Sequence, residues 1–120
     1  MNEDITCSRW LARKIGLHEA IFLEELMTQF NILDEQYKTI EINGVSGYFG
    51  LRMEEVKERT TLKRRQQCSC IETLLLLGLI DMKIKGLPGT RHFRVVEENF
   101  SKLCNSYEPE CTIEKKKYAG

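Results

Sequence analysis

Cationic and amide side chains are concentrated in two stretches of this 120-residue chain. The first reads KRRQQ over residues 63–67, and the second, over residues 83–94, holds Lys83, Lys85, Arg91, His92 and Arg94. Arg and Lys bind phosphate oxygens, Arg also binds guanine through two hydrogen bonds, and Gln can bind adenine in the same way. This chemistry is that of nucleic-acid binding, provided that both stretches face one side of the molecule.

Charge is unevenly distributed along the chain, although the formal net charge is zero. Residues 1–56 carry 5 Lys/Arg and 10 Asp/Glu (net −5), residues 57–94 carry 9 and 3 (net +6), and residues 95–120 carry 4 and 5 (net −1). A basic region between acidic flanks produces a polarised field. The alternative is a chance fluctuation on a solvated surface. This alternative has less support, because the basic region is also where the helix and hairpin signals are concentrated.

The second basic stretch belongs to a predicted β-hairpin over residues 80–95. Pro88 and Gly89 suit the corner of a type II turn formed by residues 87–90. Side chains alternate between the two faces of a strand. The alternation places Ile80, Met82, Ile84, Phe93 and Val95 on one face and Lys83, Lys85, His92 and Arg94 on the other. The predicted hairpin therefore has an apolar side for a core and a cationic side for an anion.

The first basic stretch opens a longer predicted helix, over residues 62–77, which ends at Gly78. Its predicted core face comprises Leu62, Gln66, Cys70, Ile71, Leu74 and Leu75. Its first two turns present Lys63, Arg64, Arg65 and Gln67 outward. Thr60 and Thr61 precede this helix as turn and N-cap residues. Free N–H groups at a helix start bind phosphate, so these two threonines are further candidate contacts.

The elements that must position these residues come earlier in the chain. A first helix is predicted from a cap at Asp4 or Thr6 to about Ile15, where Gly16 ends it. A second, over residues 17–33, has apolar residues at helical spacing. Its predicted core stripe is Leu23, Leu26, Met27 and Phe30, while Glu24, Glu25 and Gln29 face away.

Three shorter elements complete the prediction. A hairpin is expected within residues 37–51, around the turn signals Asn-Gly and Ser-Gly. A short helix is expected over residues 51–60 and a last helical turn over residues 98–104. A short helix, tight turn, longer helix and two-stranded hairpin is the order of a winged helix-turn-helix. The predicted fold is thus α+β and mainly α, with a C-terminal hairpin wing and a short extra hairpin before the helix-turn-helix.

Two stretches carry a resemblance to a known family. LARKIGLHEAIFLEEL, at residues 11–26, resembles the opening of phage and plasmid replication proteins, the replisome organisers and DnaD-type primosomal proteins. TLKRRQQ, followed by GLPGTRHFRV, within residues 61–95, is similar to their winged-helix part. The resemblance covers about residues 5–105. It implies that Arg64, Arg65, Gln66 and Gln67 open the recognition helix and that Gly86, Leu87, Pro88, Arg91 and Phe93 belong to the wing.

The chain departs from that family in two ways. The tryptophan-rich strands that often precede the turn are reduced here to Tyr48-Phe49. The chain also ends where relatives continue into a second domain, so it is expected to be either a stand-alone protein or an N-terminal piece. Residues 1–105 are predicted to form the winged domain, and residues 106–120 a polar, flexible tail.

The predicted function is binding of double-stranded DNA by residues 62–77 and 83–94, in initiation of phage or plasmid replication. The expected partners are double-stranded DNA, replication proteins, and a second copy in a homodimer or higher oligomer. One alternative is an interaction or oligomerisation module of a replication complex, with Phe22 and Ile32 at its seam. Another is a small transcriptional regulator.

Other function classes have little support in the sequence. The chain has no GxSxG, phosphate-loop or HExxH motif, so no enzyme activity, cofactor or small-molecule substrate is predicted. Cys68 and Cys70 point about 200° apart on a helix and cannot chelate one metal ion. Five cysteines without framework spacing, no secretory signal and no long apolar run predict reduced thiols, a cytoplasmic location and no membrane partner.

Overall fold

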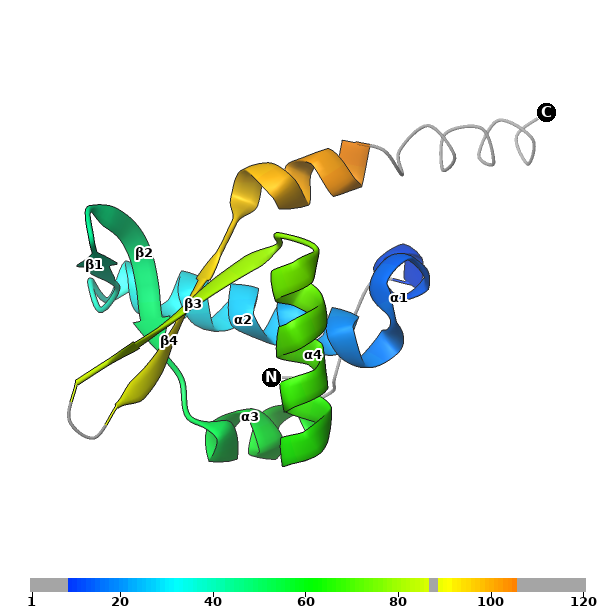
Figure 1. Cartoon of the computed structure of the whole chain (residues 1–120), viewed down its shortest axis with the longest axis horizontal. Helices are drawn as coiled ribbons and strands as arrows, with labels where there is room; N and C mark the ends of the chain where they lie inside the picture. The colour runs from blue at the N-terminus through cyan, green and yellow to red at the C-terminus, as the bar shows by residue number, and fades with distance from the viewer. Residues whose placement is uncertain (1–8, 87–88, 106–120) are drawn as a thin grey trace.

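The computed structural model of the protein describes residues 9–86 and 89–105. Its elements are α1 (Arg9–Ile15), α2 (Leu17–Glu35), β1 (Ile40–Ile42), β2 (Val45–Gly50), α3 (Met53–Thr60), α4 (Arg64–Leu76), β3 (Ile80–Lys85) and β4 (Thr90–Val95). Residues 97–105 form a further helix (Figure 1). The predicted α+β, mainly helical class is confirmed. The cap at Asp4 or Thr6, the turn residues Leu87 and Pro88, and the tail at 106–120 lie outside the described residues.

All four strands form one antiparallel sheet in the order β1-β2-β4-β3. Two hairpins stand at the predicted places, and they join because β2 pairs with β4. The β1–β2 turn follows from its sequence: Asn43 (φ 53°) and Gly44 (φ 82°) both have positive φ, which a tight type I′ turn requires. Phe93 of β4 lies opposite Met82 of β3 and Phe49 of β2, so three strands contribute to one apolar face.

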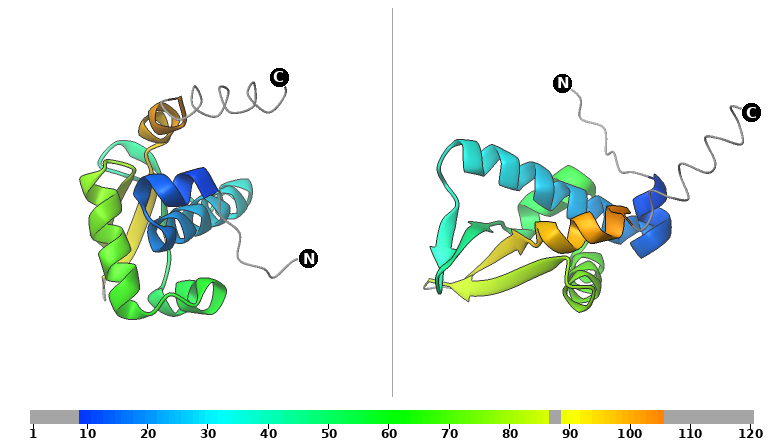
Figure 2. Two further views of the ribbon diagram at one scale, coloured as in Figure 1. Left: turned by 90° about the vertical axis from the view of Figure 1, so that its right-hand side faces the viewer. Right: turned by 90° about the horizontal axis from the view of Figure 1, so that it is seen from above.

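The long helix α2 covers that apolar face, as Figure 2 shows from above. Phe22 packs edge-on against Phe93, with ring centroids 6.0 Å apart, and Phe30 lies 6.1 Å from Phe49. The other helices close the core around α2, which contacts α1, α3 and α4. At the far end of the molecule, Trp10 of α1 meets Phe100 of the helix at 97–105, with ring centroids 6.4 Å apart.

Because α2 is surrounded on several sides, two predictions for it are wrong. Glu25 was expected to face away, but it is buried and accepts hydrogen bonds from Gln29 Nε2 (2.9 Å) and Arg59 Nε (2.5 Å). Phe22 was expected at an oligomerisation seam, but it lies in the core. Ile32, its predicted neighbour on that seam, is exposed. None of the helices in the described part of the chain is long and apolar enough to cross a membrane.

Candidate nucleic-acid interface

The first turn of α4 presents three consecutive cations to solvent: Lys63, Arg64 and Arg65. The helix begins at Arg64, two residues later than predicted, and Lys63 is its N-cap. The Lys63 backbone N–H donates to Gln66 Oε1 at 2.8 Å, which satisfies one of the N–H groups that every helix start leaves open. Gln66, predicted to face the core, is therefore partly exposed and holds the cap.

Gln67 was predicted to face outward and contact a base, and this is wrong. Its side chain is fully buried (0% exposed). Its amide Nε2 donates to the carbonyl of Met53 at 3.1 Å and to that of Leu62 at 2.8 Å. Gln67 thus ties the start of α3 to the start of α4. The spacing of Gln67, Cys70, Ile71 and Leu74 is i, i+3, i+4 and i+7, and this pattern could have placed Gln67 inside.

The predicted phosphate contacts of the two threonines are not supported. Thr60 is the last residue of α3 and is buried, with its hydroxyl donating to the Val56 carbonyl (2.6 Å) and accepting from Leu62 N–H (3.1 Å). Thr61 is exposed but takes the left-handed conformation that ends α3 (φ 66°), and its N–H already donates to the Lys57 carbonyl at 2.8 Å. Neither threonine caps α4, whose N-cap is Lys63, so neither lies at a helix start that could bind phosphate.

The β3–β4 hairpin divides its cations between two faces, as the alternation predicts. Asp81 lies opposite Arg94, Lys83 opposite His92 and Lys85 opposite Thr90, so these side chains share the face away from the core. Arg91 lies opposite Ile84 on the other face, where its guanidinium carbon stands 5.7 Å from the centre of the Phe93 ring. One of the five predicted hairpin contacts therefore points to the opposite side from the other four.

A polar cluster lies on the face of the sheet that points away from the core, and it consists of Tyr48, Asp81, Lys83 and Arg94. Tyr48 of β2 donates its hydroxyl to the Asp81 carboxylate and is only 2% exposed. The Arg94 guanidinium carbon lies 5.9 Å from the centre of the Tyr48 ring, and Lys83 Nζ lies 3.9 Å from Asp81 Oδ2. Burial raises the pKa of Tyr48, and the hydrogen bond to Asp81 raises it further, whereas Arg94 acts in the opposite direction. Lys83 and Arg94 are thus partly engaged within the protein.

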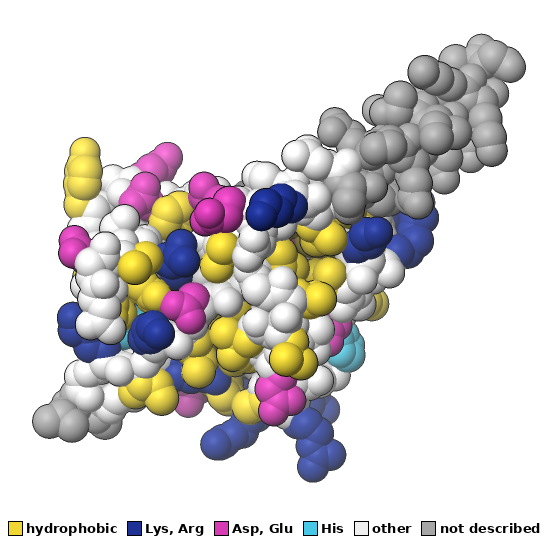
Figure 3. All heavy atoms as spheres, turned by 45° about the horizontal axis from the view of Figure 1, so that its top comes forward, with side chains coloured by type: hydrophobic (Ala, Val, Ile, Leu, Met, Phe, Trp, Pro, Cys, Tyr) yellow, Lys and Arg dark blue, Asp and Glu magenta, His cyan; other side chains and the backbone are white. Residues whose placement is uncertain are grey.

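The start of α4 and the hairpin lie on one side of the molecule. Figure 1 shows the first turn of α4 at the lower edge and the end of β3 at the lower left. The view from above in Figure 2 places α4 and β3 on the opposite side from α2. Basic side chains appear at the left and lower edges of the surface in Figure 3, with apolar and acidic ones between them. The start of α4 and the hairpin therefore lie on one side of the molecule, with their cations in two separate groups, and Arg91 lies on the opposite face of the hairpin from Lys83, Lys85 and Arg94.

The second half of α4 is different in character. Leu75, predicted to lie in the core, is partly exposed, and Leu76 is 89% exposed. Only Leu74 of this leucine run is fully buried within α4. On the solvent side the basic surface therefore gives way along the helix to the carboxylate of Glu72 and then to leucine side chains.

The two cysteines of α4 have separate environments. Cys68 is exposed, whereas Cys70 is buried in the core, and burial raises the pKa of its thiol to about 12, with a smaller contribution from Glu19. A thiol with so high a pKa is a packing group and not a nucleophile or metal ligand at neutral pH. Among residues 9–86 and 89–105, no three His, Cys, Asp or Glu side chains are grouped so that they could hold a metal ion.

No family model, no curated protein and no solved structure matches the chain. The likeness to phage and plasmid replication proteins therefore rests on the residues quoted above and on no wider similarity.

Proposed function

We propose that the chain binds double-stranded DNA with the start of α4 as the main contact and the β3–β4 hairpin as a second one. The observation that carries the proposal is the exposed run Lys63, Arg64 and Arg65, at the start of a helix that lies on the same side of the molecule as the β3–β4 hairpin. Clustered cations at a protruding helix start can reach a polyanion together, whereas scattered ones cannot.

The order of elements supports a winged helix-turn-helix for this purpose. A short helix (α3), a three-residue connection, a longer helix (α4) and a hairpin follow one another, and β2 pairs with β4 to join the hairpin to the core. In such proteins the second helix enters the major groove and contacts bases with its first residues. Gln67 fixes the two helices to each other from within, and this leaves the neighbouring Arg64 and Arg65 free for DNA.

Each cation has a role that its chemistry suits. Arg64 and Arg65 have the paired donors that guanine O6 and N7 accept, and Lys63 suits a phosphate. In the hairpin, Lys85 and His92 share the outer face and can contact phosphates that flank the groove, whereas Arg91 lies on the opposite face. Lys83 and Arg94 contribute less, because Asp81 and Tyr48 already engage them.

Replication initiation in a phage or plasmid is the setting that the resemblance favours, and a small transcriptional regulator is the alternative. Both roles would use the same helix and hairpin. The DNA sequence that is bound and the partner proteins, and not the fold, would distinguish one role from the other.

The test is fluorescence anisotropy of a labelled random-sequence duplex, titrated with the full chain over a series of salt concentrations. Neutralising three or more phosphates gives a log–log slope of about −3 or steeper, at about −0.9 per phosphate. Light scattering on the same samples gives the mass of the bound species. Absence of binding at low salt would overturn the proposal.

A further inference from the structure

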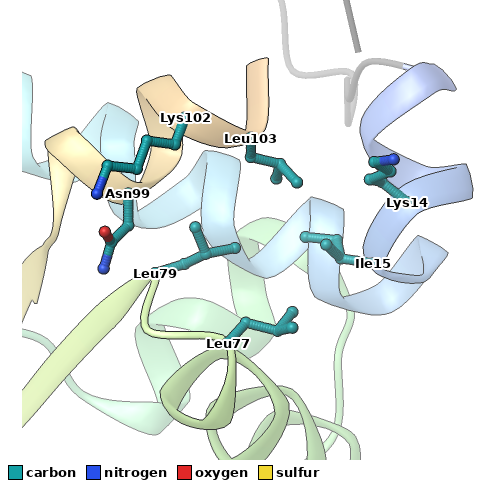
Figure 4. A pocket seen from close by; sticks show the side chains of 7 residues that line it. All are labelled: Lys14, Ile15, Leu77, Leu79, Asn99, Lys102 and Leu103. Carbon is teal, nitrogen blue, oxygen red and sulfur yellow. The ribbon is translucent and has the colours of Figure 1, made fainter. Parts of the chain in front are cut away.

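A second surface lies at the other end of α4, away from its cations. A groove of about 500 Å³ opens between α1, the end of α4 and the helix at 97–105. Figure 4 shows Leu79, Leu77, Leu103 and Ile15 converging on it from three segments of the chain. An apolar groove of this size, formed by segments far apart in sequence, is typical of a binding site.

Residues next to the groove lining in the chain are also apolar and exposed. Leu77, which lines it, is 50% exposed, and its chain neighbour Leu76 is almost fully exposed. Leu17, two residues after the lining residue Ile15, is also exposed. Monomeric proteins rarely leave several large apolar side chains together in water, and such patches mark interaction sites. An open groove with a half-exposed leucine in its lining fits a macromolecular segment better than a small ligand.

Two lysines beside the groove favour a ligand that carries negative charge. Lys14, from α1, and Lys102, from the C-terminal helix, stand at opposite ends of the groove in Figure 4. Within the part of the chain that the structure describes, neither forms an ion pair. At the Lys102 end, Asn99 donates its amide to the Gly78 carbonyl at 2.7 Å, which leaves its side-chain oxygen to accept a hydrogen bond. The groove therefore offers one cation at each end, an apolar floor and one acceptor.

We propose that this groove docks a short segment of a partner protein in which apolar side chains stand between two acidic residues. The leucines and Ile15 take the apolar side chains, Lys14 and Lys102 take one carboxylate each, and Asn99 accepts a backbone N–H. A single-headed amphiphile supplies one carboxylate only and leaves one lysine unmatched. A nucleic acid is excluded by the apolar floor. This surface is independent of DNA binding at the start of α4.

The test is selection of phage-displayed random peptides of about 12 residues on the full chain, a length that one groove can hold. Enriched peptides are expected to carry Asp or Glu on both sides of apolar residues. The double variant Lys14→Glu with Lys102→Glu, and separately Leu77→Ser, should weaken a selected peptide by about tenfold or more. The matched control, Lys38→Glu with Lys57→Glu, should stay within about twofold, because both are exposed lysines away from the groove.

Three outcomes would overturn the proposal. The first is enrichment without an acidic and apolar consensus. The second is equal loss of binding in the groove and control variants. The third concerns the chain's own acidic start: if Glu3→Gln with Asp4→Asn raises peptide affinity about tenfold, the occupant is residues 1–8 and not a partner. Variants of Lys14, Lys102 and Leu77 should leave duplex binding unchanged, which separates this surface from the DNA site.

Discussion

The start of α4 and the β3–β4 hairpin carry similar numbers of cations but use them differently. In α4, Lys63, Arg64 and Arg65 are consecutive and all exposed, because the core holds this helix through Gln67 and the apolar residues after it. In the hairpin, alternation sends Arg91 to one face and Arg94 to the other, where each lies over an aromatic ring. Charge counted along a sequence is therefore not equal to charge available for a ligand.

The largest expected effect is at the start of α4. Arg64→Ala with Arg65→Ala should weaken duplex binding by about a thousandfold (about 4 kcal/mol), since each arginine contact is worth about 1–3 kcal/mol. The melting temperature should change by less than about 2 °C, because both side chains are exposed. Anisotropy and thermal melts measure the two quantities. A loss below about tenfold would mean that α4 is not the main contact. The matched control Lys14→Ala with Lys38→Ala, two exposed lysines outside the helix-turn-helix, should bind as the wild type does.

The second largest effect is expected on the free energy of unfolding, from the two glutamines that fix the start of α4. Gln67→Ala removes two buried hydrogen bonds and leaves a cavity, so the free energy of unfolding should fall by about 3 kcal/mol. Gln66→Ala removes only the cap and should cost about 1 kcal/mol. Urea titrations of both variants measure the difference. Equal losses would contradict the placement of Gln67 in the core.

A smaller effect is expected in the hairpin. Lys83→Ala with Lys85→Ala should weaken duplex binding by about tenfold, uniformly across DNA sequences, and make the salt slope shallower by about 1. The loss is smaller than in α4 because Lys83 already lies near Asp81. If this pair proves as important as Arg64 and Arg65, the hairpin and not the helix is the main contact.

The smallest effect tests the cluster that holds Arg94. Tyr48→Phe removes the hydrogen bond to Asp81 and should cost about 1 kcal/mol of unfolding free energy at pH 7. Because the folded protein raises the pKa of Tyr48 above 10, the neutral phenol is favoured in the folded state. Its contribution is complete below pH 10 and is lost as the pH rises further. Urea titrations between pH 7 and pH 11 should therefore show a steeper decline for the wild type than for Tyr48→Phe. Tyr37→Phe is the control, because Tyr37 is 94% exposed.

The local periodicities were enough to predict most of the elements. The alternation in 80–95 gave both faces of the hairpin, and the Asn-Gly pair gave the first hairpin, because period and turn chemistry act between near neighbours in the chain. Gly16, expected to end the first helix, does so with a φ of 108°. These features need no knowledge of the rest of the fold.

The wrong predictions concern residues whose burial depends on partners in other elements of the fold. Glu25 is buried because Arg59, 34 residues away, reaches its carboxylate. Gln67 is buried because the carbonyls of Met53 and Leu62 converge on it. Neither partner can be read from local spacing. Within the leucine run after residue 73, α4 presents consecutive side chains in different directions, so only part of the run can be buried at once.

The contact between Trp10 and Phe100 brings the first and last described helices together. A fold whose first and last described helices meet tolerates a change of connectivity, because residue order can be altered without moving any element. Joining residue 120 to residue 1 would make a linker of the 23 residues that lie outside 9–105, and new ends could open between Asn43 and Gly44, in an exposed turn. Such a circular permutant would keep both the α4 cations and the groove. Because its new ends are neighbours in one turn, it would also suit insertion into a loop of a host protein.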